Sequence, residues 1–300
     1  MKRTLSILGA LLVLLVPSLE TAHAELLCAC GMDEVFLLQV PTNQASPGKK
    51  LWSWRAKGHD ELPAALRSSF GSTDDCKPVE GGAKVLISSS GGACALVERP
   101  SGRVLWYARV PNAHSLELLP SDRVVAASSV DRRGNRLLLF DLAHSDHVVW
   151  ETPLDSAHGV VWDEPRRCLW ALGMQELRCC HLKDWDTDRA ALALREAYPL
   201  PQVNGHDLQL VPRTPDLILC TGPGVLLFDQ NTHQFRPHPQ LGNVPDVKSV
   251  NVHPLSGRTV FTQGSSAGWW TDTLNFLAPD AKIQLSNERL YKVRWFPDAK

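Results

Sequence analysis

Residues 112–162 of this 300-residue chain contain four strand-like runs, after which the same pattern starts again. The segment begins N-A-H-S-L-E-L-L-P-S-D-R-V-V-A-A at Asn112, continues through R-L-L-L-F-D-L and V-V-W-E-T-P-L, and reaches S-A-H-G-V-V-W at Ser156. His114 and His158 therefore hold the same place in successive repeats of about 44 residues, and four strands at a period of ~40–45 residues are typical of a β-propeller blade.

The start of this repeat recurs along the chain. In five places a polar residue is followed by apolar residues at the second and fourth positions and then by a proline, and a sixth start, at Lys77, is less regular. The alternation is strand periodicity, and the proline suits the turn that ends the strand. Each start marks the innermost strand of one blade. The starting residues are Lys77, His114, His158, His206, Lys248 and Tyr291.

The two ends of the chain complete one another. Residues 25–56 contain three strand-like runs but lack an inner strand, whereas Arg289 to Pro297 form an inner strand with nothing after it. A blade built from both termini closes the ring and removes free sheet edges. We therefore predict an all-β, six-bladed β-propeller as a single domain over residues 25–300, with 57–75 as an irregular linker and short helix between blades. A β-sandwich and a seven-bladed ring with one degenerate blade are the alternatives.

Residues 1–24 have the pattern of a cleavable signal peptide. A positively charged start is followed by an apolar run over residues 5–16 and by an A-H-A cleavage motif that ends at Ala24. The run is too short to span ~30 Å of hydrocarbon. We therefore predict a secreted or periplasmic protein with no membrane span. A lipoprotein is a minor alternative, because the sequence around Cys28 is a poor lipid-attachment motif.

The overall charge argues against a nucleic-acid partner, and the spacing of the cysteines argues against a zinc-finger site. Lys and Arg number 31 against 32 Asp and Glu, so there is no overall field to attract nucleic acid. The eight cysteines fit no zinc-finger spacing, and most are interpreted as small buried apolar residues. Cys30 and Cys76 are the exception, since the propeller topology would place both on one face. They are the one pair that we single out as a candidate disulfide, since the sequence cannot fix the pairing of eight cysteines.

The starts of the inner strands converge on one face of a propeller, around the central channel. Histidine occupies this position in three neighbouring blades. A single histidine in a strand is usually a satisfied core residue, but three at one repeat position favour a functional site. Loops between the second and third strands should reach the same face. The predicted ligand-binding residues are Lys77, Lys292, Trp269, Trp270, Asp272, Gln175 and Gln263.

Three kinds of function would use such a ring. His114, His158 and His206 are neutral nitrogen ligands that would hold one divalent metal ion and leave a coordination position open. In β-elimination on an acidic sugar, Lys248 or the metal would neutralise the carboxylate, His158 would accept the proton, and Tyr291 would protonate the leaving oxygen. In plain binding, lysines would hold an anion and one tryptophan would stack on a sugar.

The leading prediction is a protein that binds or acts on an anionic small molecule or oligosaccharide, an acidic saccharide being the favoured class. If it is an enzyme, it is predicted to be a carbohydrate lyase or hydrolase. A metal-assisted lyase is the form suggested by analogy with the His-rich oligogalacturonate-lyase propellers, an analogy of fold and ring alone. A non-catalytic ligand- or protein-binding propeller is the alternative. A purely structural role, with the histidines bonded to backbone, is the third interpretation.

Several short motifs together resemble a known family. They are C-K-P-V at Cys76, N-A-H-S at Asn112, S-A-H-G-V-V-W-D at Ser156, G-H-D-L at Gly205, V-K-S-V-N-V-H-P at Val247 and W-W-T-D at Trp269. The chain resembles an uncharacterised family of secreted bacterial six-bladed β-propellers, a domain of unknown function. The likeness covers nearly the whole chain after the signal segment. It implies the fold and carries no activity with it.

Overall fold

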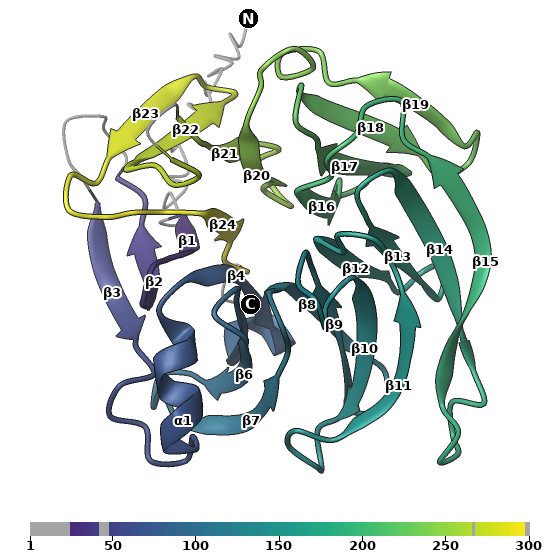
Figure 1. Cartoon of the computed structure of the whole chain (residues 1–300). Coiled ribbons are helices and arrows are strands. Elements are labelled where there is room, and N and C mark those ends of the chain that lie inside the picture. The colour runs from purple at the N-terminus through teal and green to yellow at the C-terminus, as the bar shows by residue number, and fades with distance from the viewer. Residues whose placement is uncertain (1–24, 42–47, 266–267, 298–300) are drawn as a thin grey trace, which may run out of the picture.

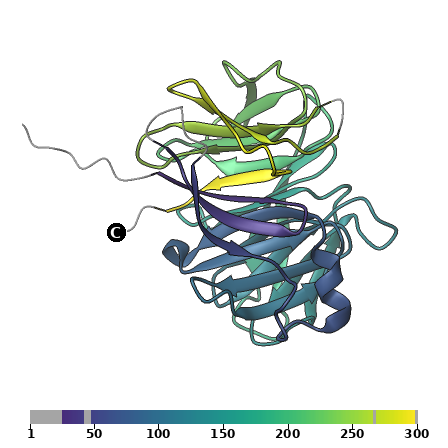
Figure 2. The ribbon, with the colours of Figure 1, turned by 90° about the vertical axis from the view of Figure 1, so that its left-hand side faces the viewer.

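The computed structural model describes residues 25–41, 48–265 and 268–297. Within these ranges, six four-stranded antiparallel sheets stand around a central axis as the blades of a propeller (Figure 1). The side view shows the sheets stacked around that axis (Figure 2). The predicted all-β, six-bladed β-propeller is confirmed, and neither the sandwich nor the seven-bladed alternative is found. The predicted signal peptide, residues 1–24, lies outside the described residues.

Five blades consist of four consecutive strands. The second blade contains β4 (Thr73–Val79), β5 (Lys84–Ser89), β6 (Ala93–Glu98) and β7 (Val104–Arg109), and the third contains β8 (Ala113–Leu119), β9 (Arg123–Ser128), β10 (Arg136–Asp141) and β11 (Val148–Pro153). The fourth contains β12 (Gly159–Asp163), β13 (Cys168–Leu172), β14 (Glu176–Lys183) and β15 (Ala191–Pro199). The fifth contains β16 (Asp207–Leu210), β17 (Asp216–Cys220), β18 (Val225–Asp229) and β19 (Gln234–Pro237), and the sixth β20 (Val247–Val252), β21 (Thr259–Gln263), β22 (Thr273–Leu277) and β23 (Ala281–Gln284).

The first blade combines the two ends of the chain, as predicted. Its inner strand is β24 (Lys292–Trp295), which pairs antiparallel with β1 (Leu26–Gly31) and is followed outward by β2 (Glu34–Gln39) and β3 (Lys49–Trp54). The inner strands β4, β8, β12, β16, β20 and β24 each contact the next, and the last returns to the first. The inner strands therefore form a closed ring, and hydrogen bonds between β24 and β1 join the end of the chain to the first blade.

The segment between the first and second blades contains one turn of α-helix, α1 (Ala64–Arg67), followed by the 3-10 helix η1 (Ser68–Phe70). Leu66 and Phe70 from these helices are buried against Trp54, in the cluster between these two blades. The predicted linker ran to residue 75, whereas β4 already begins at Thr73. A second 3-10 turn, η2 (Glu80–Gly82), joins β4 to β5.

The core is divided among the gaps between neighbouring blades. Each apolar cluster joins side chains from two adjacent sheets, such as Trp106 of β7 and Phe140 of β10, whose rings meet edge to face. Both faces of a sheet are thus buried, and the middle strands of the blades are largely apolar, as β9 and β13 show. Burying one large aliphatic or aromatic side chain contributes ~1.5–3 kcal/mol. The outer strands have more exposed residues, as β11 and β19 show.

Candidate functional site

Six side chains occupy equivalent positions at the start of the inner strands. In β4, β8 and β20, the position is an irregularity in the pairing with the second strand. In the other blades it is the residue just before the strand, whose backbone N–H donates to the second strand, as from His158 to the Leu172 carbonyl at 2.9 Å. We call these six residues the ring. They are Asp74, His114, His158, His206, Lys248 and Tyr291.

The predicted position of Lys77 was wrong. The ring residue of the second blade is Asp74, because β4 begins at Thr73 and pairs with β5 from there. Lys77 lies further along the same strand. It faces the channel on the same side as Asp75, since residues two apart in a strand point the same way. The other five predicted starting residues are at the ring.

The three histidines lie against one another at the mouth of the channel. Ring centroids are 4.1 Å apart for His114 and His158, and 5.4 Å apart for His158 and His206. The Nδ1 atoms of His114 and His158 lie 3.0 and 2.9 Å from the carbonyl oxygens of Asn112 and Ser156. A carbonyl oxygen only accepts, so each Nδ1 carries the proton, and in the neutral ring Nε2 is the bare acceptor.

Burial keeps these imidazoles neutral. Desolvation, with a further contribution from the neighbouring histidines, lowers the pKa of His158 well below the ordinary 6.5. Desolvation and the nearby Lys248 and Lys292 ammonium groups lower the pKa of His206 to about 3. The pKa of His114 is lowered mainly by burial, which outweighs the attraction of Asp74. At neutral pH the ring therefore presents uncharged nitrogens, as acid–base and metal chemistry both require.

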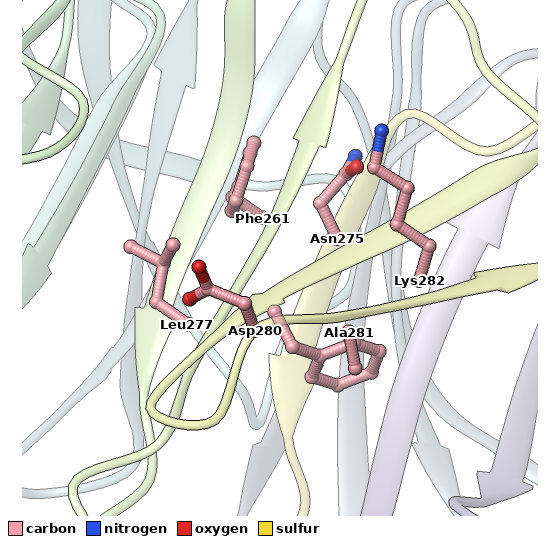
Figure 3. A pocket seen from close by; sticks show the side chains of 7 residues that line it. Phe261, Asn275, Leu277, Asp280, Ala281 and Lys282 are labelled. Atoms are coloured by element: carbon pink, nitrogen blue, oxygen red, sulfur yellow. The ribbon is translucent and has the colours of Figure 1, made fainter. Parts of the chain in front are cut away.

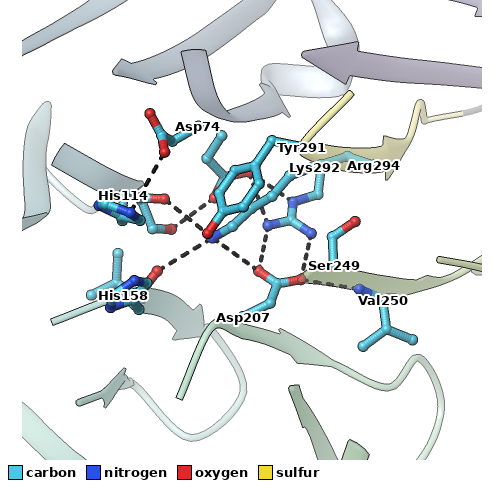
Figure 4. A network of polar contacts seen from close by, with 12 residues as sticks. Asp74, His114, His158, Asp207, Ser249, Val250, Tyr291, Lys292 and Arg294 are labelled. Carbon is cyan, nitrogen blue, oxygen red and sulfur yellow. Dashed lines mark hydrogen bonds and ion pairs between the residues drawn. The ribbon is translucent and has the colours of Figure 1, made fainter. Parts of the chain in front are cut away.

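Asp74 is the ring residue that sequence reasoning missed. Its Oδ1 lies 3.5 Å from Nε2 of His114 (Figure 4). Burial raises the pKa of Asp74, against the effect of the nearby histidine and of hydrogen bonds from Ser90. The pKa shifts of Asp74 and His114 thus both favour the uncharged forms, and burial is the main cause of each.

Lys248 supplies a cation at the ring. Its Nζ lies 3.4 Å from Nε2 of His206 and 3.2 Å from Oδ1 of Asp246. The lysine side chain is largely buried, whereas the Asp246 side chain is 60% exposed. An ion pair with so exposed a partner is weakened by solvent, so the ammonium group can exchange this partner for a ligand anion.

Tyr291 and Trp269 form the aromatic side of the mouth. Their rings meet edge to face, with centroids 5.2 Å apart, and Trp269 is 40% exposed while Tyr291 is buried. Burial raises the pKa of Tyr291 well above its usual value, so its hydroxyl stays protonated. Trp270 instead packs beneath the guanidinium group of Arg289, 4.7 Å from its ring centroid. Of the two predicted tryptophans, Trp269 is the one beside the ring.

The remaining loop residues make bonds elsewhere. The Nε2 of Gln263 donates to the Pro245 carbonyl at 2.9 Å. The carboxylate of Asp272 accepts from Gln284 on the outer strand β23. Gln175 is exposed and lines a separate surface cavity of about 460 Å³. In the described residues, the contacts of these three side chains are with groups outside the ring. Their role in ligand binding therefore stays a prediction.

A buried ionic network fills the channel next to the ring (Figure 4). Three of its residues directly follow ring residues, and Arg294 lies two positions beyond Lys292 on β24. Arg294 donates to both carboxylate oxygens of Asp207, at 2.8 and 2.6 Å, and through Nε to Asp75 at 2.9 Å. Nζ of Lys292 lies 3.4 Å from Asp207 and donates to the carbonyl oxygens of His114 and His158. We call these four charged residues the plug. They are Asp75, Asp207, Lys292 and Arg294.

The plug gives Lys292 an internal role in place of the predicted contact with a ligand. Its side chain is 0% exposed, and its ammonium group is bonded within the protein. Burial alone would raise the pKa of Asp75 and Asp207, but Arg294 and Lys292 outweigh it and hold both below the ordinary value. The carboxylates are therefore charged, and two positive charges balance two negative ones.

Neither a metal-binding cluster nor a membrane-spanning helix is found in residues 25–41, 48–265 and 268–297. Within them, no three His, Cys, Asp or Glu side chains are grouped so as to hold a metal ion. The predicted metal site of His114, His158 and His206 stays a prediction. No helix in the described residues has the length and apolar character needed to cross a membrane.

The predicted disulfide is wrong. All eight cysteines are free and buried. The thiols of Cys30 and Cys76 do lie in contact, as the topology indicated, and burial raises the pKa of both. Thiols with raised pKa values form little thiolate, which is the species that reacts.

Surface cavities lie away from the ring. One of about 470 Å³ is formed on the sixth blade by residues of β21, β22 and β23 (Figure 3). Its charged side chains, Asp280 and Lys282, are exposed, and Phe261 forms its buried wall. Its charged groups are open to water, so it offers less chemistry than the ring, where several titratable groups are buried together.

Comparison with known proteins identifies a family and a fold. Residues 36–300 match the family model described as "Family of unknown function (DUF6528)". No curated protein matches the sequence. Among solved structures, a chain in "Crystal structure of Nidogen/Laminin Complex" is similar, with a TM-score of 0.61 and 11% sequence identity over 91% of this chain and 98% of that chain. At this identity, the likeness concerns the fold alone.

Proposed function

The chain belongs to this family of unknown function, and we propose from its site that it binds an acidic saccharide at the ring end of the channel. One observation carries the proposal. The Nε2 atom of His158 and the hydroxyl group of Tyr291 have no hydrogen-bond partner in the described residues, and they lie beside an exposed tryptophan.

These groups match the chemistry of a sugar. A saccharide presents hydroxyl groups, which donate and accept hydrogen bonds, next to weakly polar C–H faces that pack on aromatic rings. His158 supplies an acceptor, Tyr291 a donor, and Trp269 an exposed ring. Aromatic rings with one apolar face and a polar neighbour are common in such sites.

The preference for an acidic sugar comes from Lys248. Its ammonium group is the cation of the ring, and its carboxylate partner Asp246 is exposed. A uronate carboxylate would take the place of Asp246. An ammonium–carboxylate hydrogen bond is roughly twice as strong as a neutral one, so neutral oligosaccharides should bind more weakly.

Calorimetric titration with oligogalacturonate, and with its neutral methyl ester as comparison, tests the proposal. Trp269→Ala and Lys248→Met should each weaken binding of oligogalacturonate roughly tenfold or more. Leu194→Ala and Lys282→Met, at exposed sites on β15 and β23, are the matched controls. Equal affinity for the acid and the ester would refute the role of Lys248, and the absence of binding to either would refute the proposal.

Lyase activity is the second candidate, favoured by the protonation states of two ring residues. His158 is neutral and Tyr291 is protonated at neutral pH. In β-elimination, Nε2 of His158 would take the proton from the carbon next to the uronate carboxylate. A carbon–carbon double bond would form as the glycosidic oxygen leaves with the proton of Tyr291. A divalent metal, if bound, would neutralise the carboxylate.

The two candidates separate in one experiment. A lyase releases an unsaturated uronate that absorbs ultraviolet light. His158→Gln and Tyr291→Phe should abolish its release but weaken binding only in part, because Lys248 and Trp269 still contact the sugar. If wild-type protein binds oligogalacturonate without producing the unsaturated product, the binding function stands alone.

A further inference from the structure

The opposite end of the channel contains a cavity of about 250 Å³. Each of the six inner strands contributes to its lining, and one residue from each lies at the same level of the channel. These residues are Lys77, Glu117, Val161, Gln209, Asn251 and Arg294. They lie two positions beyond the level of Asp75, Asp207 and Lys292 on the strands, and Arg294 of the plug forms part of the cavity wall. The ring is on the other side of the plug, and nothing in the ring proposal depends on the cavity.

The cavity contains a buried amide group without a partner. Gln209 is 8% exposed, and its Nε2 has no hydrogen-bond partner in the described part of the chain. Leaving a buried donor unsatisfied is unfavourable, and a ligand acceptor would remove that cost. In Asn251, Oδ1 accepts from the Trp295 backbone N–H at 2.7 Å, which leaves its Nδ2 as a second donor.

A buried lysine adds a third donor. Nζ of Lys77 donates to Oε2 of Glu117 at 2.8 Å and also to the Val160 carbonyl. An ammonium group carries three protons, so one remains for a ligand. Arg294 adds positive charge, while its guanidinium bonds are used by Asp75 and Asp207. Donors therefore outnumber acceptors on this wall.

We propose that this cavity binds a small organic carboxylate. Its two oxygens would accept from Gln209 and Lys77, with Asn251 at the side, and its carbon chain would lie against Trp162 and Trp295, which also line the cavity. Pockets for drug-sized molecules measure roughly 300–1,000 Å³. The smaller volume here favours an acid of a few carbon atoms over an oligosaccharide.

The test is a nuclear magnetic resonance titration of the full mature chain labelled with ¹⁵N-glutamine. Acetate, lactate and succinate are added as sodium salts, with sodium chloride as the control. The side-chain amide signal of Gln209, identified by its loss in Gln209→Leu, should shift and saturate with at least one carboxylate and stay fixed with chloride. A signal that moves with none of the three acids would overturn the proposal.

Variants locate the site. Gln209→Leu and Lys77→Met should each weaken the carboxylate roughly tenfold or more, whereas Trp269→Ala at the ring should leave its affinity unchanged. Gln209→Glu keeps the shape of the side chain and introduces a repelling charge, so it should abolish binding while the far-ultraviolet circular dichroism stays that of the wild type. Unchanged affinity in Gln209→Glu, or loss of affinity in Trp269→Ala, would contradict the assignment.

Discussion

The two ends of the channel are built from the same six strands, yet they have different chemistry. The ring end presents neutral imidazoles, a tyrosine and an exposed Trp269. The far end presents an ion pair between Lys77 and Glu117 with amide groups beside it. Between them, the plug holds two charges of each sign.

This difference shows that successive positions along the repeated inner strands carry different chemical groups. On β4 a step of two residues leads from Asp75 of the plug to Lys77 of the far end, and on β16 the same step leads from Asp207 to Gln209. Since alternate residues of a strand face the same side, each inner strand offers the channel several levels that vary independently. The following experiments act on the plug, on the ring and on the far end.

Removing Arg294 should have the largest effect. Arg294→Ala leaves the buried carboxylates of Asp75 and Asp207 without their main partner. Breaking a buried ion pair in this way costs ~3–5 kcal/mol, which urea denaturation measures. Arg103→Ala, which removes a solvent-exposed pair with Glu98, should cost far less, because water screens the pair. Similar losses in the two variants would mean that the plug does not hold the blades together.

Acid should destabilise the ring before it affects the plug. The folded-state pKa values of the three histidines lie below 6.5, so unfolded chains take up protons that the folded ring refuses, and stability falls as the pH drops below that value. At about pH 5, each fully shifted histidine costs about 2 kcal/mol.

The carboxyl groups of the plug, and those of Asp74 and Glu117, change the stability of the fold over other pH ranges. The lowered pKa values of Asp75 and Asp207 make their contribution vanish only below 3.8. Asp74 and Glu117 have raised pKa values and oppose the histidines, since they favour the fold at low pH. Denaturation between about pH 7 and 5 should therefore show a loss that the triple variant His114→Gln, His158→Gln, His206→Gln removes. An unchanged slope in that variant would assign the loss to other groups.

The far end should be of intermediate sensitivity. Lys77→Met leaves Glu117 without its ion-pair partner in a largely buried position, and we expect a loss of ~1–3 kcal/mol. Trp269→Ala at the exposed ring mouth should stay within about 0.5 kcal/mol of the wild type. Thermal denaturation of both variants tests the order, and a larger loss in Trp269→Ala would reverse the comparison.

The smallest effect concerns metal binding at the ring. Lys248 occupies Nε2 of His206, so a Zn²⁺ ion would have to displace an ammonium group. Lys248→Met should therefore bind Zn²⁺ more tightly than the wild type, by roughly tenfold, and His158→Ala should lose the gain. Metal content after dialysis against Zn²⁺ measures both. Tighter binding by the wild type than by Lys248→Met would show that the lysine does not compete.

The sequence predicted the blades well because each repeat carries its own signals. The alternation after His158 and His206, and the unpaired inner strand near Tyr291, required only local periodicity and a count. The prediction of where the second blade starts was wrong because its start, S-T-D-D-C, resembles a polar linker. The irregular pairing at Asp74 also has no sequence signal.

The plug could not be predicted from the sequence for a different reason. Arg294 contacts carboxylates 219 and 87 positions earlier in the chain, and only the closed ring brings them together. An available clue was a lysine and an arginine in the otherwise apolar K-V-R-W of the last strand. For Cys30 and Cys76, topology predicted the contact, but it carries no information on whether neighbouring thiols are oxidised.

The closing strand sets the order of events during synthesis. A chain emerging from the ribosome presents Asp75 and Asp207 long before Lys292 and Arg294, since both cations are on β24. Until then, the inner faces carry two uncompensated carboxylates and the first blade lacks its innermost strand. Native packing of the channel must therefore await the last strand, and a chain that stops before it would lose ring closure and charge balance together.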